Sequence, residues 1–248
     1  MNIIICNDDG IDSNGLKALA KRLSMKHNVL VVAPSNNCSA KSHALTIGEA
    51  VKVDKILEKP YLAYSLSGTP VDCLKFAKLY FSDFNTDIVV SGINKGHNLG
   101  SDILYSGTVS IALEGAFYGH PSFAFSAFNL GESDFENLAI YAERLIEKLL
   151  PLSSRGEVWN VNFPNCQLNE IKGVKFAKLG KHLYSDRYEK ISENQYKLVG
   201  EVIDCADNDA DCDTEWIKNN FITITPILFD RTNYSKLKNT NCLEINLD

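Results

Sequence analysis

The sequence predicts an α/β fold, a three-layer sandwich in which helices cover both faces of a mostly parallel sheet. Residues 2–6, 29–33 and 87–91 are dominated by apolar, mostly β-branched side chains, as strands buried on both faces are. Over residues 13–26 and 135–149, apolar positions recur every three or four residues, which is typical of helices that pack on a sheet. This alternation of strands and helices indicates a parallel sheet.

Length and composition set limits on the function. No flexible or highly charged linker divides the 248 residues, so we expect a single domain over residues 1–248. The net charge of -6 argues against a nucleic acid polymer as partner. No run approaches the ~20 apolar residues of a membrane span, and the chain does not start with a basic signal segment. We therefore expect a cytoplasmic protein without a membrane partner. The seven cysteines contain no Cys-x-x-Cys pair, which favours reduced thiols over a zinc site.

Two adjacent carboxylates follow the first strand. Asp8 and Asp9 lie directly after residues 2–6, and Gly10 allows a sharp turn. The carboxyl ends of the strands are where open α/β sheets bind ligands, and carboxylates are hard oxygen ligands for Mg²⁺ or a similar cation. The alternative is a capping turn between strand and helix, because Asp and Asn are common there.

The second strand leads into a polar loop. Pro34 ends this strand, and the loop over residues 35–46 starts at its carboxyl end. Ser39 could offer a hydroxyl to a metal ion from this loop, although a solvated turn residue is the alternative. Residues 50–67 then alternate in the manner of exposed antiparallel strands, and Thr69 precedes a proline in a typical helix start.

The third strand, residues 87–91, leads into a stretch with six glycines between positions 92 and 119. Glycine at this density indicates backbone in left-handed conformations or close to a ligand. Asn94 follows its strand as Asp8 follows the first. If the two strands are neighbours, the amide oxygen of Asn94 and both carboxylates converge on one point.

Ser106, Gly107 and Thr108 begin a further helix. Free N–H groups at a helix start, together with two hydroxyls and a glycine, can bind phosphate. The alternative is that the two hydroxyls only cap the helix. Other nucleotide and hydrolase motifs are missing from the sequence, since it contains no G-x-G-x-x-G after the first strand, no P-loop and no G-x-S-x-G elbow.

The motifs occur in an order that resembles the SurE family of survival-protein nucleotidases. They are NDDG at 7–10, VAP at 32–34, N-x-S at 37–39, SHALT at 42–46, SGTPVDC at 67–73, VVSGIN-x-G at 89–96, N-x-G at 98–100 and YSGTV at 105–109. NVNFP at 160–164 and the segment 214–226 extend the resemblance nearly to the end of the chain.

The resemblance implies a metal-dependent phosphatase, a 5'-nucleotidase that also acts on 3'-monophosphates and sometimes on short polyphosphate. It implies a Rossmann-like core and a homodimer or homotetramer with exchanged arms. By position, the ligands of one Mg²⁺ or Mn²⁺ per subunit fall on Asp8, Asp9, Ser39 and Asn94. The residues that contact the phosphate fall on Asn98, Ser106, Gly107 and Thr108.

This chain departs from the family pattern at the mouth of the expected site. Many members carry Asp-Arg after VAP, whereas this chain has Ser35 and Asn36, so one basic group is missing and substrate choice is affected. Ala40 replaces a frequent glycine. His97 lies inside the glycine-rich stretch, either as a general acid or as a partly exposed loop residue.

The expected chemistry is hydrolysis of a phosphomonoester. The divalent ion would neutralise the phosphate and lower the pKa of a bound water for in-line attack, with Asp8 or Asp9 as base. A phospho-aspartyl route is the chemical rival, but it is disfavoured because the D-x-D spacing of dehalogenase-type phosphatases is absent. An alternative function from a different class is a sensor that binds nucleotide and metal but does not hydrolyse the nucleotide.

The C-terminal third differs from the predicted core, which ends at about residue 170. Tyrosines among charges and alternating strands over residues 171–248 indicate oligomerisation arms. We expect a hairpin near residues 183–202 and the segment from residue 230 to exchange with a partner subunit, or else to fold back in a monomer. The aspartates that alternate over residues 207–213 are compatible with a calcium site. A solvated loop is favoured because the EF-hand glycine and glutamate are missing.

Overall fold

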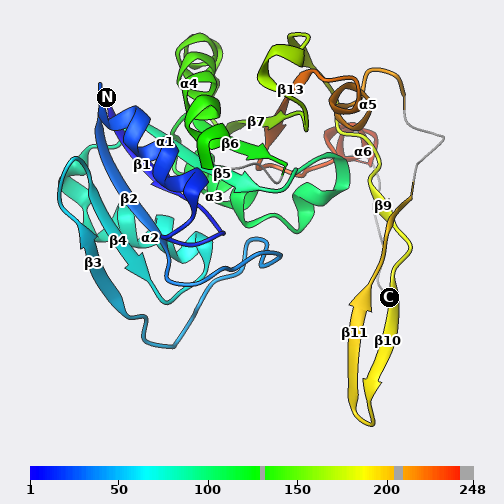
Figure 1. Cartoon of the computed structure of the whole chain (residues 1–248), viewed down its shortest axis with the longest axis horizontal. Coiled ribbons are helices and arrows are strands. Elements are labelled where there is room, and N and C mark those ends of the chain that lie inside the picture. The colour runs from blue at the N-terminus through cyan, green and yellow to red at the C-terminus, as the bar shows by residue number, and fades with distance from the viewer. Residues whose placement is uncertain (129–131, 204–208, 241–248) are drawn as a thin grey trace.

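The computed structural model describes residues 1–128, 132–203 and 209–240, and nine strands of this part form one sheet (Figure 1). The spatial order is β3-β4-β2-β1-β5-β6-β7-β13-β8. Six neighbouring strands from β4 to β7 are parallel, whereas β3 and β13 run antiparallel to their inner neighbours. The strands are β1 (Asn2–Cys6), β2 (Asn28–Pro34), β3 (Val53–Leu57), β4 (Leu62–Leu66), β5 (Ile88–Lys95), β6 (Ser122–Ala127), β7 (Glu157–Phe163), β8 (Val174–Phe176) and β13 (Ile222–Leu228).

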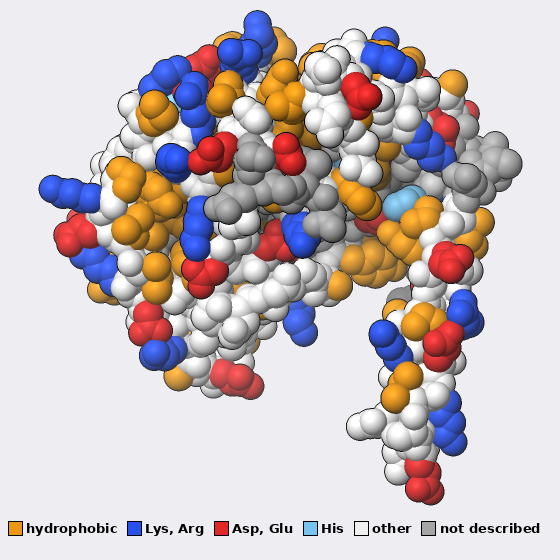
Figure 2. Space-filling view, in the orientation of Figure 1, with side chains coloured by type: hydrophobic (Ala, Val, Ile, Leu, Met, Phe, Trp, Pro, Cys, Tyr) orange, Lys and Arg blue, Asp and Glu red, His pale blue; other side chains and the backbone are white. Residues whose placement is uncertain are grey.

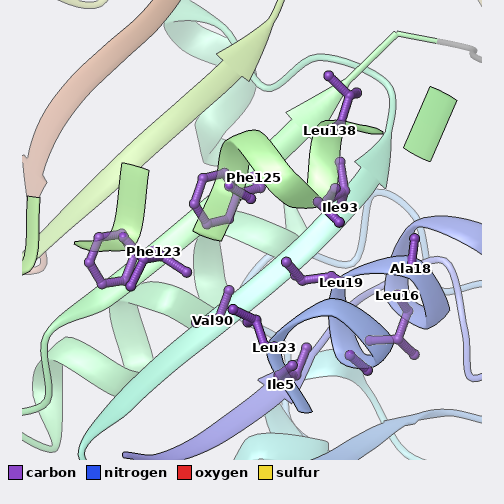
Figure 3. Close-up of a cluster of buried hydrophobic side chains, with 14 of the residues drawn as sticks. Ile5, Leu16, Ala18, Leu19, Leu23, Val90, Ile93, Phe123, Phe125 and Leu138 are labelled. Atoms are coloured by element: carbon purple, nitrogen blue, oxygen red, sulfur yellow. The ribbon is translucent and has the colours of Figure 1, made fainter. Parts of the chain in front are cut away.

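Helices cover both faces of the sheet, which makes three layers. The α-helices are α1 (Asn14–Ser24), α2 (Pro70–Tyr80), α3 (Gly107–Phe117), α4 (Glu132–Leu149), α5 (Asp213–Lys218) and α6 (Tyr234–Thr240). Short 3₁₀ helices span η1 (Ser82–Phe84), η2 (Gly100–Leu104), η3 (Leu150–Leu152) and η4 (Leu168–Glu170). Leu19 of α1, Leu138 of α4 and Ile93 of β5 belong to one buried apolar cluster on one face of the sheet (Figure 3). Helices α2 and α3 cover the opposite face, where Leu74 contacts the apolar side chains of β1 and β2.

Local sequence explains where these elements begin. All apolar side chains of β1 are fully buried, as the run of isoleucines predicts. At α2, Thr69 and Asp72 form a reciprocal capping box in which each side chain accepts a backbone N–H from the other. Asp72 also accepts the backbone N–H of Thr46, so this carboxylate fixes the loop before the helix as well as the helix start.

Two features of the sheet differ from the sequence prediction. Residues 50–67 do form an antiparallel pair, but β4 is also parallel to β2 and largely buried, so it belongs to the core. The sheet also extends beyond residue 170, because β8 and β13 complete the edge next to β7. Alternation of residue types does not distinguish an exposed strand from one that a helix covers on one face.

A hairpin stands away from the body of the molecule as an arm (Figure 1). Its long strands are β10 (Arg187–Ser192) and β11 (Gln195–Val199), and β9 (Leu183–Tyr184) pairs with β12 (Val202–Ile203) at its base. These strands are almost entirely exposed, including their apolar side chains. The arm therefore has little of its own chain to pack against. Residues 241–248, the end of the second predicted arm, lie outside the described residues.

The acidic run over residues 204–215 is only partly a solvated loop. Asp209 is exposed and forms an ion pair with Lys178, whereas Asp213 is fully buried at the start of α5. The carboxylate of Asp213 accepts the backbone N–H groups of Gly100 and Gly180 at 2.8 and 2.7 Å. It thereby ties the glycine-rich stretch to the C-terminal third. Residues 204–208, including Asp207, lie outside the described residues. Among the helices that the structure describes, none is long and apolar enough to cross a membrane.

Candidate active site

The carboxyl ends of β1 and β5 bring the predicted metal ligands together. The two strands are adjacent and parallel, with Cys6 opposite Ser91. Asp9 accepts the backbone N–H of Lys95 through Oδ2 at 2.9 Å, so this carboxylate lies against the residue that follows Asn94. Asp9 and the end of β5 therefore lie at the same edge of the sheet, as the carboxyl-end rule predicts.

The loop after β2 closes over the same turn. The backbone N–H of Cys38 donates to the carbonyl oxygen of Asp8 at 2.7 Å, which fixes the loop beside the acidic pair. Asn37 orders the backbone two residues further on, because its Oδ1 accepts the backbone N–H of Ser39 at 2.9 Å. Ser39 itself is exposed to solvent. The predicted hydroxyl ligand thus lies one residue from a direct contact with Asp8.

The Asp8 carboxylate is buried, and the part of the chain that the structure describes gives it no cationic partner. Its side chain is only 4% exposed, and burial raises its pKa to about 6, against an opposing hydrogen bond from Thr108 and with a further contribution from the charge of Asp9. Burial also raises the pKa of Asp9. Across the described ranges, no lysine, arginine or histidine forms an ion pair with Asp8. Two neighbouring carboxylates held in this way fit a bound cation.

The remaining donors are neutral oxygens. Asn94 donates its Nδ2 hydrogen to the carbonyl of Gly96 at 2.9 Å, which leaves its Oδ1 as the atom for a cation. Within residues 1–128, 132–203 and 209–240, no group of three or more His, Cys, Asp or Glu side chains is placed to hold a metal. A cation at this turn would therefore depend on an amide and a hydroxyl beside the two carboxylates. Such a set of hard oxygen ligands suits Mg²⁺ or Mn²⁺ better than zinc.

The start of α3 packs directly against Asp8. The hydroxyl of Thr108, which is fully buried, donates to Asp8 Oδ1. Ser106 caps the helix, since its Oγ accepts the backbone N–H of Val109 at 3.0 Å. A Cβ atom on Gly107 would lie 2.7 Å from the Cβ of Asp8, closer than real contacts allow. Glycine is needed here for close approach, and both hydroxyls already have protein partners.

Asn98, the remaining predicted phosphate contact, is the centre of a buried amide network. Its backbone N–H donates to Asn162 Oδ1 at 2.8 Å, and its Nδ2 donates to Ser126 Oγ at 2.7 Å. Its carbonyl oxygen accepts hydrogen bonds from the Nδ2 atoms of Asn160 and Asn162. Because Ser126 lies opposite Asn94 in the β5–β6 pair, the network adjoins the acidic turn.

The sequence prediction did not include Asn160, Asn162 or Ser126. Asn160 and Asn162 are two residues apart on β7, so they point to the same face of the sheet and both reach Asn98. A signal for them was present in the motif NVNFP, since two asparagines in an otherwise apolar strand need buried partners.

His97 is not placed as a general acid. Its Nε2 bonds to the carbonyl oxygen of Phe163 at 2.7 Å, and a carbonyl accepts only, so Nε2 carries the hydrogen. Burial lowers the pKa of His97, so the ring is neutral at pH 7. Ser35 and Asn36, where the chain departs from the family pattern, are both exposed.

Comparison with known proteins identifies the relatives of this chain. The family model described as "Survival protein SurE" matches residues 3–186. This chain belongs to the SurE family. A 5'-nucleotidase SurE of Clostridium botulinum (strain ATCC 19397 / Type A) is 42% identical over 252 residues, which cover 98% of this chain and 99% of that protein. A second, from strain Eklund 17B / Type B, is 40% identical and covers 96% of this chain and 97% of its own length.

A solved structure has the same fold. The SurE protein from Aquifex aeolicus superposes with a TM-score of 0.81 at 35% identity and covers 96% of this chain and 97% of its own. The match confirms the three-layer α/β sandwich with a mostly parallel sheet. The C-terminal hairpin predicted for the SurE resemblance is also present.

Proposed function

We propose that this SurE-family chain is a metal-dependent 5'-nucleotidase, which hydrolyses nucleoside 5'-monophosphates to nucleoside and phosphate. The nucleotidase class follows from membership of the family and from curated relatives named 5'-nucleotidase SurE that are aligned over nearly the whole chain. The observation that carries the metal dependence is the pair Asp8 and Asp9, two adjacent carboxylates at the carboxyl end of β1. Asp8 is buried, and none of the described residues forms an ion pair with it.

In this proposal, Asp8, Asp9, Ser39 and Asn94 hold one Mg²⁺ or Mn²⁺. The bound ion supplies charge neutralisation of the phosphate and lowers the pKa of water. Asp8 is held in position by the Thr108 hydroxyl. Asp9 is the more exposed of the two carboxylates. From the described residues it accepts a backbone N–H of Lys95 and a long contact from Asn37 at 3.5 Å. Asp9 is therefore the better placed of the two to accept a proton from water.

The phosphate group is proposed to bind where α3 and the amide network adjoin the acidic turn. Gly107 lets the helix start approach this turn without a side chain between them. Asn98 is held by its amide network beside the same turn. The Thr108 hydroxyl donates its hydrogen to Asp8 and so positions that carboxylate, whereas Ser106 Oγ accepts the backbone N–H of Val109 and can still donate its own hydrogen to the phosphate. Binding of phosphate then relies on Asn98, the Ser106 hydroxyl, the helix N–H groups and the cation.

On the basis of the family resemblance, we extend the proposed substrates to nucleoside 3'-monophosphates and short polyphosphate.

We also propose a homodimer or homotetramer in which the arm β10–β11 packs on a partner subunit. The support is the exposure of its apolar side chains, among them Tyr188 at 71% and Ile191 at 61%.

A phosphate-release assay over a panel of nucleotides tests the function. Wild-type chain should release phosphate from 5'-monophosphates with Mg²⁺ or Mn²⁺, lose activity in EDTA and regain it when metal is added back. The Asp9→Asn variant should be at least 100-fold slower, since it removes a carboxylate from the site without disturbing β1. A chain that binds nucleotide and metal but releases no phosphate would instead be the sensor.

A further inference from the structure

A cavity of about 450 Å³ lies beside the proposed phosphate site. His97 and Leu99, which flank Asn98 in the chain, line it together with Phe128 and Asn165. Figure 2 shows histidine and hydrophobic side chains gathered in a hollow between the body and the arm. The volume falls within the range of pockets that take small organic ligands.

The position of the cavity follows from the order of the strands. Phe128 comes directly after β6 and Asn165 two residues after β7, so both follow the edge of the sheet at which Asp8 and Asp9 lie. Strand β6 is two places from β1 in the sheet, or roughly 10 Å at the usual strand spacing. A ligand with its phosphate at the acidic turn could therefore extend along this edge into the cavity.

The walls combine apolar surface with a few ordered polar groups. The ring of Phe128 is 46% exposed and lies 5.6 Å from the ring of His97 between centroids. Opposite the body, the base of the arm supplies Tyr184, whose hydroxyl donates to Asp102 at 2.9 Å. Asp102 also accepts the Nδ1 hydrogen of His182 at 2.5 Å. Such a wall suits a flat aromatic group that also carries hydrogen-bonding edges.

We propose that this cavity binds the nucleoside part of the substrate, with the base packed against Phe128; the inference rests on the proposed function. An exposed aromatic ring is a general platform for stacking a base. His97 donates through Nε2 to Phe163 and is neutral, so its Nδ1 is left as an acceptor for a hydroxyl or amino group. The site thereby selects nucleotides over phosphomonoesters that lack a base.

The test compares 5'-AMP with glycerol 2-phosphate, a phosphomonoester without an aromatic group. In Phe128→Ala, the KM for 5'-AMP should rise about tenfold, a change within the range for loss of one base-stacking contact. The kcat/KM for glycerol 2-phosphate should change less than about twofold. Phe128→Trp keeps an aromatic face and should restore the KM for 5'-AMP.

A matched control is Phe229→Ala. Phe229 is 42% exposed, packs edge-on against Phe117 and lines a different hollow, so its loss should leave both substrates unaffected. An unchanged KM for 5'-AMP in Phe128→Ala, or an equal loss on both substrates, overturns the nucleoside pocket alone. If the wild-type chain hydrolyses glycerol 2-phosphate but no nucleotide, the proposed function fails and this inference fails with it.

Discussion

Replacing Asp8 with asparagine should make the metal-free chain more stable while abolishing its activity. Asp8 is 4% exposed, and its pKa rises from an ordinary 3.8 to about 6 on folding, chiefly because of burial. Since one pKa unit corresponds to about 1.4 kcal/mol, the ionised form costs the folded state about 3 kcal/mol. Asparagine carries no charge and its Oδ1 can still accept the Thr108 hydroxyl. For a chain of this length, about 3 kcal/mol corresponds to roughly 6–12 °C in melting temperature as an upper limit.

The sign of the effect with pH follows from the raised pKa of Asp8. Folding favours the protonated form, so the cost is present above the folded pKa of about 6 and absent below the unfolded value of 3.8. Thermal melts in EDTA should therefore show the gain for Asp8→Asn at pH 8 and little gain near pH 4. The control is Asp12→Asn, which removes an exposed carboxylate paired with Lys17 and should have a small effect at either pH. If Asp8→Asn were less stable than the wild type at pH 8, the ionised Asp8 carboxylate would not destabilise the folded metal-free chain, and this reasoning would be refuted.

Three other predictions concern the neighbouring structure. Gly107→Ala should lower activity at least tenfold while the chain stays folded by circular dichroism, because the new Cβ displaces Asp8; normal turnover would count against the close approach. Thr69→Ala should cost about 1 kcal/mol in denaturant unfolding, through loss of the capping box with Asp72, and leave kcat unchanged. Deletion of Arg187–Val199 should reduce the number of subunits per particle, obtained as the light-scattering mass divided by the mass of the shortened chain. An unaltered number of subunits would exclude this arm from the subunit contact.

The sequence was sufficient for the central strands and for placing the acidic pair and Asn94 at the ends of two neighbouring strands. Apolar runs specify β1, β2 and β5, and a parallel sheet places their carboxyl ends at one edge. The parallel pairing of β4 was not predictable in the same way, because alternation of residue types does not reveal which neighbour a strand takes.

The contacts that support the site required the fold. The bond from Thr108 to Asp8 joins residues 100 positions apart and depends on how α3 packs against the acidic turn. Asp213 is part of an acidic run that resembles a solvated loop, yet it is buried because the fold brings two unpaired backbone N–H groups to its carboxylate. The sequence shows which side chains carry polar groups, whereas the residues that form hydrogen bonds with them lie far away in the chain.

Calorimetric titration of Mn²⁺ into the metal-free chain, with phosphate release from 5'-AMP measured on the same samples, tests the central claim most directly. The proposed metal site at Asp8 and Asp9 predicts one Mn²⁺ per subunit for the wild type and at least tenfold weaker binding for Asp9→Asn, with activity lost in parallel. Equal Mn²⁺ affinity in the two proteins, or undiminished phosphate release in EDTA, would contradict it.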